Sequence, residues 1–387
     1  NIKIYIKFMN YISRIIEKRI KERLFKEKVI ILYGARQVGK TTLTQKILAE
    51  FGGNGKYLNC ELASVEMGLS ALEAEKIKSF LGDYKIIVLD EAQNIPNIGR
   101  VLKIIVDTYP KMQIIATGSS SFDLFQKISE SLTGRNFQFI LYPLSAGEIK
   151  ESKDLFYLES KLENLLRFGG YPGVFGLSEE EAKERLNEIS ANYLYKDILK
   201  FEGLKKSSVI KNLLQALALQ IGQEVSYQEL AVKLGINRLT VQKYMDILEQ
   251  AFIVFKLNSF SRNKRKEISK SVKVYFHDLG IRNSLIENYN PLEIRNDAGF
   301  LWENFCMIER KKYNEYNMNF VNMYFWRTYD QKEIDLIEER EGKLFAYEFK
   351  LNDKKGKIPK SFLASYPDSE FQIIDKSNYW QFLCPKN

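Results

Sequence analysis

A glycine-rich loop between Ile31 and Leu48 carries the residues best suited to hold a phosphate. The segment GARQVGKT, residues 34–41, matches the pattern G-x-x-x-x-G-K-[ST] at every defined position. In such loops the backbone N–H groups surround phosphate oxygens at the start of a helix. Lys40 is expected to reach the β- and γ-phosphates, and the Thr41 hydroxyl to bind Mg²⁺. The residues expected to line the nucleotide are Gly34, Ala35, Arg36, Gln37, Val38, Gly39, Lys40, Thr41 and Thr42.

An acidic pair, Asp90 and Glu91, ends the apolar segment YKIIVLD. Carboxylates at strand ends face the crevice where open α/β sheets bind ligands. Asp90 is expected to hold Mg²⁺ directly or through water, and Glu91 to orient and deprotonate the attacking water. No N-K-x-D stretch stands at a guanine-reading position, and the acidic pair favours ATP.

Three further residues are candidates for the same site. Thr117 and Ser119 end the segment MQIIATGSSS, where either side chain could contact the γ-phosphate or the water. Arg135, in the loop SLTGR, is a candidate arginine finger that acts in cis or on a neighbouring molecule. A surface arginine that caps its own loop is the alternative for Arg135.

A second set of charged residues lies near the C-terminus. In KLFAYEFKL, Glu348 and Lys350 fall on one face of a strand because side chains alternate. If the preceding hairpin turns at Glu341-Gly342, the register places Asp335 opposite Glu348, with Cβ atoms about 4.5–5.5 Å apart. Two carboxylates at that spacing could share a Mg²⁺, and Lys350 could activate a water. The alternative for Asp335 is a solvated acid on a surface hairpin.

The elements that must position the first set alternate between strand and helix. Strands are expected at 28–33, 56–62, 84–90, 112–121 and 137–145, with helices such as 41–51 and 99–109 between them. Repeated β–α units predict a parallel sheet with helices on both faces, which is the P-loop NTPase arrangement.

The middle of the chain is predicted to be helical and then to form a winged helix-turn-helix. Ser226 should cap a helix that ends at Leu234, Gly235 should end it, and Asn237 should cap the next helix. Two strand-like segments then flank a basic stretch, which suits phosphate contacts. The candidate nucleic-acid contacts are Arg238, Gln242, Lys243, Arg262, Lys264, Arg265, Lys266 and Lys270.

The last hundred residues predict the order α-β-β-β-α-β, typical of the PD-(D/E)XK nuclease fold. Glu303, on the first helix of that order, stands where this class places a further acidic metal ligand. The expected metal ligands of the whole chain are therefore Thr41, Asp90, Glu303, Asp335 and Glu348. The predicted domains are 1–146 (P-loop ATPase), 147–222 (helical linker or lid), 223–280 (winged helix) and 281–387 (nuclease-like).

Composition limits the alternatives. The chain has 387 residues, one histidine and three widely spaced cysteines, which argues against zinc proteases, Ser-His triads and disulfide scaffolds. A formal charge of +9 favours a polyanionic partner. No segment approaches the length of a membrane span, so a cytoplasmic location without membrane contact is expected.

The segments YGARQVGKTTL, IIVLDEAQNIP, ATGSSSFDL, SLTGRNFQFILYPLS and FGGYP, in this order, resemble a family of archaeal and bacterial AAA-type P-loop ATPases. Members of that family carry a C-terminal region related to PD-(D/E)XK nucleases. The resemblance covers nearly the whole chain and implies ATP binding and a role as a switch or motor, with no substrate specified.

Three functions are compatible with these features. The first is an ATP- and Mg²⁺-dependent enzyme that binds nucleic acid, with DNA as the expected form, and cleaves it at Asp335, Glu348 and Lys350. The second is a nucleotide-controlled switch that binds DNA or protein and cleaves nothing. The third uses the basic wing to contact a protein partner, and a homo-oligomer is compatible with all three.

Overall fold

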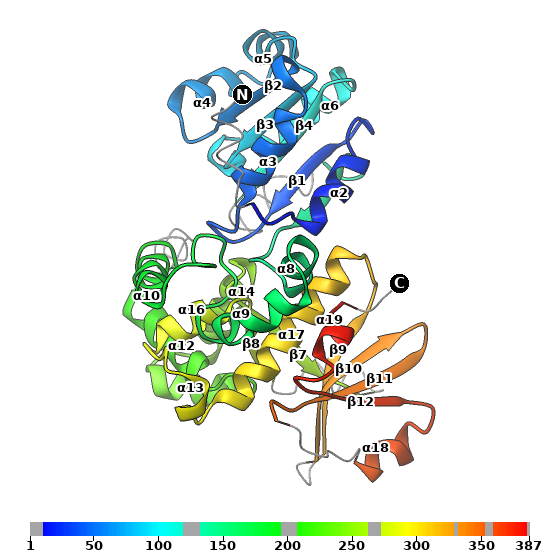
Figure 1. Ribbon diagram of the computed structural model, residues 1–387. Coiled ribbons are helices and arrows are strands. Elements are labelled where there is room, and N and C mark those ends of the chain that lie inside the picture. The colour runs from blue at the N-terminus through cyan, green and yellow to red at the C-terminus, as the bar shows by residue number, and fades with distance from the viewer. Residues whose placement is uncertain are drawn as a thin grey trace. The chain divides into compact units, whose positions relative to one another are not determined.

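The computed structural model describes residues 11–118, 132–194, 207–261, 272–328, 332–352 and 359–384 (Figure 1). The chain forms two compact units. The first comprises residues up to Leu144 together with Gln250–Phe252, and the second comprises Ser145–Glu249 and the residues from Ile253 onward. In the described residues, no helix is both long and apolar enough to cross a membrane.

The first unit is built on a five-stranded parallel sheet, as the alternating pattern predicts. Its strands are β1 (Val29–Tyr33), β2 (Gly55–Asn59), β3 (Ile86–Asp90), β4 (Gln113–Gly118) and β5 (Asn136–Ile140). Their order is β2-β3-β4-β1-β5, so β4 lies between the strand that precedes the glycine loop and the strand that ends in Asp90. The mixed α/β class with a parallel sheet flanked by helices is therefore confirmed.

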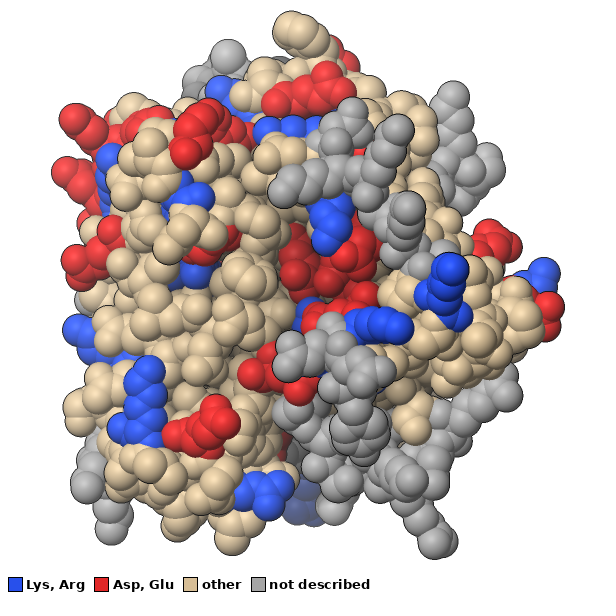
Figure 2. Space-filling model, turned by 90° about the horizontal axis from the view of Figure 1, so that it is seen from below, with Lys and Arg blue, Asp and Glu red and all other residues tan. Residues whose placement is uncertain are grey.

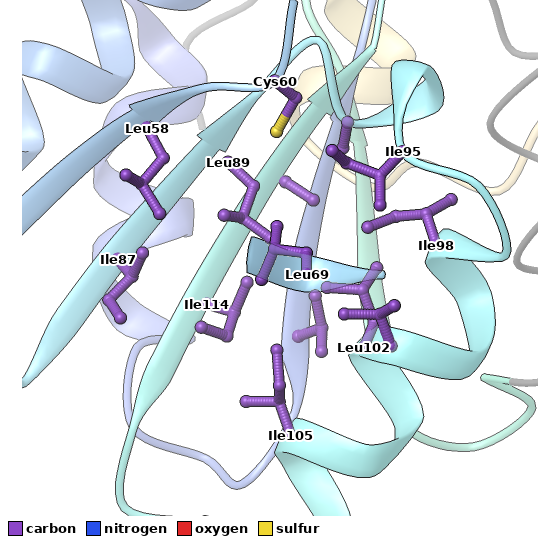
Figure 3. Close-up of a cluster of buried hydrophobic side chains, with 14 of the residues drawn as sticks. Leu58, Cys60, Leu69, Ile87, Leu89, Ile95, Ile98, Leu102, Ile105 and Ile114 are labelled. Carbon is purple, nitrogen blue, oxygen red and sulfur yellow. The ribbon is translucent and has the colours of Figure 1, made fainter. Parts of the chain in front are cut away.

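Helices cover this sheet because its strands are apolar on both faces. The helices are α2 (Ile15–Glu22), α3 (Lys40–Ala49), α4 (Ala63–Leu69), α5 (Ala74–Leu81) and α6 (Ile98–Thr108), with short 3₁₀ turns at Gly52–Asn54 and Ala92–Asn94. Figure 3 shows one face of the sheet, where Ile87, Leu89 and Ile114 pack with side chains of α6 and Leu69 of α4. The alternate strand residues, such as Val88 and Ile115, are equally buried and point to the opposite face.

The second unit begins with helices and continues into a large sheet. Its helices are α8 (Ala146–Ser152), α9 (Leu155–Phe168), α10 (Glu179–Glu188), a π-helix (Ile189–Leu194), α12 (Ser207–Leu219), α13 (Tyr227–Leu234), α14 (Arg238–Gln250), α16 (Leu279–Leu285), a 3₁₀ turn (Leu292–Ile294), α17 (Ala298–Tyr316), α18 (Lys360–Ser365) and α19 (Tyr379–Leu383). Its strands are β6 (Glu224–Val225), β7 (Val254–Ser259), β8 (Val272–Phe276), β9 (Asn322–Arg327), β10 (Glu333–Arg340), β11 (Lys343–Phe349) and β12 (Glu370–Ile374).

In the described part of this unit, seven strands form one sheet in the order β12-β11-β10-β9-β7-β8-β6. Strand β8 pairs antiparallel with both β6 and β7. The parallel pairing of β7 with β9, through Asn258–Tyr324 and Ser259–Phe325, continues the sheet into the C-terminal region. The segments 223–280 and 281–387, which the sequence treats as separate domains, therefore share a sheet.

The local predictions for the helix-turn-helix segment are confirmed. The Ser226 side chain accepts a hydrogen bond from the Glu229 N–H at 3.3 Å, so it caps α13. Gly235 ends that helix with φ +64°, a conformation that favours glycine. Asn237 Oδ1 accepts from the Thr240 N–H at 2.7 Å before α14 continues.

Candidate functional sites

The glycine loop lies at the carboxyl end of β1 and leads into α3. Gly34 has no substitute there, because a Cβ on it would lie 2.2 Å from the carbonyl oxygen of Leu141. Gly39, with φ +100°, turns the chain into α3. Lys40 is buried, and its Nζ donates to the carbonyl oxygens of Gly34 at 2.8 Å and Ala35 at 2.9 Å. The lysine that is expected to reach the phosphates therefore lies folded within its own loop.

The Asp90 carboxylate joins three elements at this edge of the sheet. Its Oδ2 accepts from the hydroxyls of Thr41, at 2.7 Å, and Tyr57, at 2.5 Å. Its Oδ1 accepts from the hydroxyl of Thr117 at 2.5 Å. The strand order explains why these side chains lie together, since β4 brings Thr117 between the glycine loop after β1 and the end of β3. Asp90 itself is only 5% exposed.

Two residues of this site were not identified from the sequence. Tyr57, in β2, reaches Asp90 because Asn59 and Asp90 are paired across neighbouring parallel strands. Burial and the Asp90 carboxylate raise the pKa of Tyr57, so its hydroxyl stays a donor. Arg14, which precedes α2, is buried and donates to the carbonyl oxygens of Val38, at 2.8 Å, and Tyr142. Arg14 thereby supports the glycine loop from outside the nucleotide motif.

Glu91 and Ser119 are two further residues predicted for the nucleotide site. The backbone of Glu91, with φ +55°, follows β3 directly, and its N–H donates to Thr117 Oγ1 at 3.0 Å. The Glu91 carboxylate accepts a hydrogen bond from the Gln93 amide. Ser119 lies outside the described residues.

Arg135 does not join this group. It lies just before β5, whose first residue pairs with Val29, whereas the glycine loop follows Tyr33 at the other end of β1. Arg135 Nε contacts Asp107 Oδ1 at 2.6 Å, and both side chains are about two-fifths exposed, at 41% and 43%. This position does not suit contact with a nucleotide in the same chain, because the length of strand β1 separates Arg135 from the glycine loop.

The second unit contains a pocket of about 800 Å³, and four predicted residues line it: Glu303, Asp335, Glu348 and Lys350. The other charged residues of its lining are Glu224, Lys273, Arg295, Arg327 and Glu333. Figure 2 shows acidic side chains gathered in a hollow on one face of the molecule, with basic side chains at its margin. The pocket combines α17 with strands β6, β8, β10 and β11.

The hairpin β10–β11 has the predicted register. Arg340 pairs with Lys343, and Leu336 pairs with Tyr347. Continuing this register by one residue places Asp335 opposite Glu348. The turn is at Glu341-Gly342, where both residues have positive φ. Asp335 Oδ2 accepts from the Phe349 N–H at 2.9 Å, and Glu348 Oε1 accepts from Lys350 Nζ at 2.6 Å.

The pocket perturbs the carboxyl group of Asp335. Burial, followed by the nearby charges of Glu303 and Glu348, raises its pKa well above the ordinary value, and Lys273 opposes this rise. Glu303 approaches from α17, where its Oε1 accepts from the Tyr275 hydroxyl at 2.6 Å and from Lys273 Nζ at 3.1 Å. Lys273, Tyr275 and Glu333 were not identified as site residues from the sequence.

The carboxylates of the pocket do not surround a metal position as they stand. Their oxygens are the ligand type that Mg²⁺ prefers. In the described part of the chain, however, no three His, Cys, Asp or Glu side chains are grouped so as to hold a metal ion. The carboxylates instead converge on the Lys273 ammonium, which contacts Glu333 and lies 3.9 Å from Asp335 Oδ1.

The candidate nucleic-acid contacts are described only in part. Arg238, Gln242 and Lys243 are exposed on α14, a helix that buries Val241, Tyr244 and Leu248. Arg262, Lys264, Arg265, Lys266 and Lys270 lie outside the described residues.

Comparison with known proteins assigns the first unit. Residues 26–150, which include the glycine loop and Asp90, match the family model of an AAA domain. The first unit contains an AAA domain. Residues 159–292 and 298–378 match two further models, each described as a domain of unknown function (DUF8612 and DUF4143).

Similar proteins extend over most of the chain, beyond the AAA domain. An uncharacterized protein of Mycobacterium tuberculosis is 28% identical over 342 residues, which are 86% of this chain and 72% of that protein. An uncharacterized protein of Methanocaldococcus jannaschii is 28% identical over 394 residues. The match covers 94% of this chain and 87% of that protein. An uncharacterized protein of Haemophilus influenzae is 25% identical over 354 residues. The match covers 86% of this chain and 83% of that protein. The two units thus occur together in bacteria and archaea.

Proposed function

We propose that this protein binds and hydrolyses ATP and that the nucleotide state controls its binding to nucleic acid. The observation that carries the ATPase proposal is the convergence of Thr41, Thr117 and Asp90 beside the Lys40 loop. An AAA domain over the same residues supports it. AAA domains ordinarily act on ATP with Mg²⁺, and the Thr41 hydroxyl and Asp90 carboxylate, 2.7 Å apart, are oxygen donors of the type this ion binds.

Each residue has a separate role in this proposal. Lys40 leaves the loop carbonyls and binds the β- and γ-phosphates. Thr41 and Asp90 hold the magnesium ion, which neutralises phosphate charge when bound. Glu91 accepts a proton from the attacking water, and Gln93 keeps the Glu91 carboxylate in place.

Two variants test the ATPase proposal. Lys40→Ala should reduce ATP binding and lower hydrolysis by about 100-fold, because a charged contact to the phosphates is lost. Glu91→Gln should still bind ATP and yet hydrolyse it at least about 100-fold more slowly. Lys103→Ala, an exposed change on α6, is the control. Wild-type hydrolysis by both site variants would contradict the assignment.

Nucleic-acid binding is proposed for the segment from α12 to β8. The order helix, strand, helix, helix, strand, strand, with β6 and β7 both antiparallel to β8, is that of a winged helix. The exposed Arg238, Gln242 and Lys243 are groups that contact phosphates and base edges. The basic stretch that begins at Arg262 and the net charge of +9 add to this proposal.

The DNA-binding proposal is tested by the dependence of affinity on salt. Each phosphate contact releases counterions, so the logarithm of the binding constant should fall linearly with the logarithm of salt concentration. Arg238→Ala with Lys243→Ala should make the slope shallower, and ATP should change the affinity of the wild type. An affinity that does not vary with salt would instead favour a protein partner for this surface.

Metal-dependent phosphodiester cleavage is a second candidate function. Its support is that Glu303, Asp335, Glu348 and Lys350, which the sequence predicts as one set, line one pocket. The order of elements from α17 to β12, which resembles PD-(D/E)XK nucleases, supports it further. Circular and linear DNA and RNA should be tested with Mg²⁺ or Mn²⁺, with and without ATP. Cleavage lost in Lys350→Ala and altered in Lys40→Ala would support an ATP-governed nuclease. Hydrolysis of ATP without any cleavage would favour a nucleotide-controlled binding switch.

A further inference from the structure

Lys273 lies at the centre of the carboxylate pocket although it belongs to β8 of the helix-turn-helix segment. Its side chain is 2% exposed. The Nζ atom is 3.1 Å from Glu303 Oε1, contacts Glu333 Oε1 and lies 3.9 Å from Asp335 Oδ1. Three carboxylates from two elements, α17 and β10, therefore surround one ammonium group.

The surroundings keep this lysine charged and in place. Burial alone would lower the pKa of Lys273, but the charges of Glu303, Asp335 and Glu333 raise it above its ordinary value. The Phe325 ring centroid lies 5.7 Å from Nζ, within the range of a cation–π contact. The Tyr275 hydroxyl donates to the same Glu303 oxygen as Lys273, so both groups orient that carboxylate.

We propose that Lys273 is a resident cation of this pocket and competes with a divalent metal ion for the carboxylates of Glu303, Glu333 and Asp335. The proposal rests on the second candidate function, in which these acids form a metal site. It accounts for the absence of a metal-binding group among the described acids, since the acids are arranged about an ammonium. It also distinguishes Lys273 from Lys350, which contacts Glu348 at the more exposed side of the pocket.

Strand β8 therefore contributes two side chains that contact the acids of the pocket. Lys273 is two residues from Tyr275 on this strand, and both contact Glu303. Metal affinity in this pocket should therefore depend on the charge at residue 273.

The test is Mn²⁺ binding to the full-length protein, measured by titration calorimetry and by the loss of free Mn²⁺ signal in electron paramagnetic resonance. Lys273→Met keeps the length of the side chain and removes its charge, so it should bind Mn²⁺ at least about tenfold more tightly than the wild type. Lys256→Met is the matched control, because Lys256 in neighbouring β7 also contacts two acids, Asp246 and Glu249, but does not line the pocket. Adding Asp335→Asn to Lys273→Met should abolish the gain.

Buried acids without their counter-ion could prevent Lys273→Met from folding, so Lys273→Gln and a thermal-shift measurement accompany it. Mn²⁺ should raise the melting temperature of either variant more than that of the wild type. Equal Mn²⁺ affinity in wild type and folded variants would overturn the inference while leaving the metal site intact. Absence of Mn²⁺ binding in all of them would overturn the metal site itself, and the inference with it.

Discussion

At the scale of single residues, Asp90 has the most consequential contacts in the AAA domain. One carboxylate accepts three hydroxyl hydrogen bonds while buried, which fixes its position before any nucleotide binds. The three donors are not equivalent, because Thr41 belongs to the glycine loop whereas Tyr57 belongs to β2 at the far side of β3.

This difference predicts unequal effects of substitution. Asp90→Asn should lower ATP hydrolysis by about 100-fold or more, since the charge proposed to hold the metal ion is lost. Tyr57→Phe removes one neutral donor and leaves Asp90 both threonines, so a change of less than about tenfold is expected. Steady-state ATPase assays on both variants decide this. A larger loss in Tyr57→Phe than in Asp90→Asn would show that Tyr57 takes part directly.

Asp297 gives a residue-scale prediction about pH. Burial would raise its pKa, but hydrogen bonds from Arg295 and Arg282 lower it from the ordinary 3.8 to about 2. A depressed carboxyl pKa stabilises the fold above the unfolded value, and that stability is lost as pH falls through the folded value. The loss should amount to about 2 kcal/mol between roughly pH 4 and pH 2.

Denaturant unfolding of the wild type and of Asp297→Asn at several pH values measures this contribution. The difference in unfolding free energy between the two proteins should shrink across that interval. A difference that stays constant down to pH 2 would mean that the arginines do not stabilise the ionised form.

The sequence identified residues that follow a spacing rule and missed residues that depend on spatial neighbours. Lys40, Thr41 and Asp90 follow from local motifs, and Glu348 with Lys350 follows from strand alternation. Tyr57 and Lys273 carry no such pattern. Their roles arise because β2 lies beside β3, and because β8 lies near α17, and both are facts of sheet order that local periodicity does not specify.

At the scale of elements, the hairpin β10–β11 positions two acids of the pocket, because its turn fixes the pairing of Asp335 with Glu348. Gly342 has φ +78° and no atom within 4 Å of an added Cβ, so alanine there meets only backbone strain. Gly342→Ala should lower the unfolding free energy by about 1 kcal/mol. Gly299→Ala, in helix α17 with equally open space, should raise it by about 0.5–1 kcal/mol.

Chemical denaturation of the full chain compares the two substitutions directly. Opposite signs are the expected result. Two stabilising substitutions would show that the turn does not hold residue 342 in the left-handed region.

The elements themselves were largely predictable and their assembly was not. Strands β1, β3 and β4 lie within the predicted segments, since a buried parallel strand leaves a continuous apolar run. Strands β2 and β5 each begin one residue before theirs. The turn at Glu341-Gly342 was predicted because glycine accepts positive φ. The parallel pairing of β7 with β9 was missed, since two short polar-edged segments, Asn258–Ser259 and Tyr324–Phe325, leave no pairing signal in sequence.

At the scale of the whole molecule, the second unit should unfold as one body from α12 to β12. Besides the β7–β9 pairing, Asn304 of α17 exchanges two hydrogen bonds with the backbone of Phe276 in β8, at 2.8 and 2.9 Å. Hydrogen exchange in increasing denaturant should therefore give β8 and β10 amides the same opening free energy. Earlier loss of protection in β6 to β8 alone would indicate an independent winged-helix domain.

The shared sheet also has a consequence for recombination between relatives. The family models divide the second unit between residues 292 and 298, yet the sheet and the Lys273–Glu303 contact cross that division. A hybrid gene joined there would take Lys273 from one parent and Glu303 from the other, although these two residues contact each other. A hybrid joined between Leu144 and Ser145 would inherit every internal contact of the second unit from one parent. Exchange of the residues up to Leu144 is thus the crossover that best preserves the contacts of the second unit.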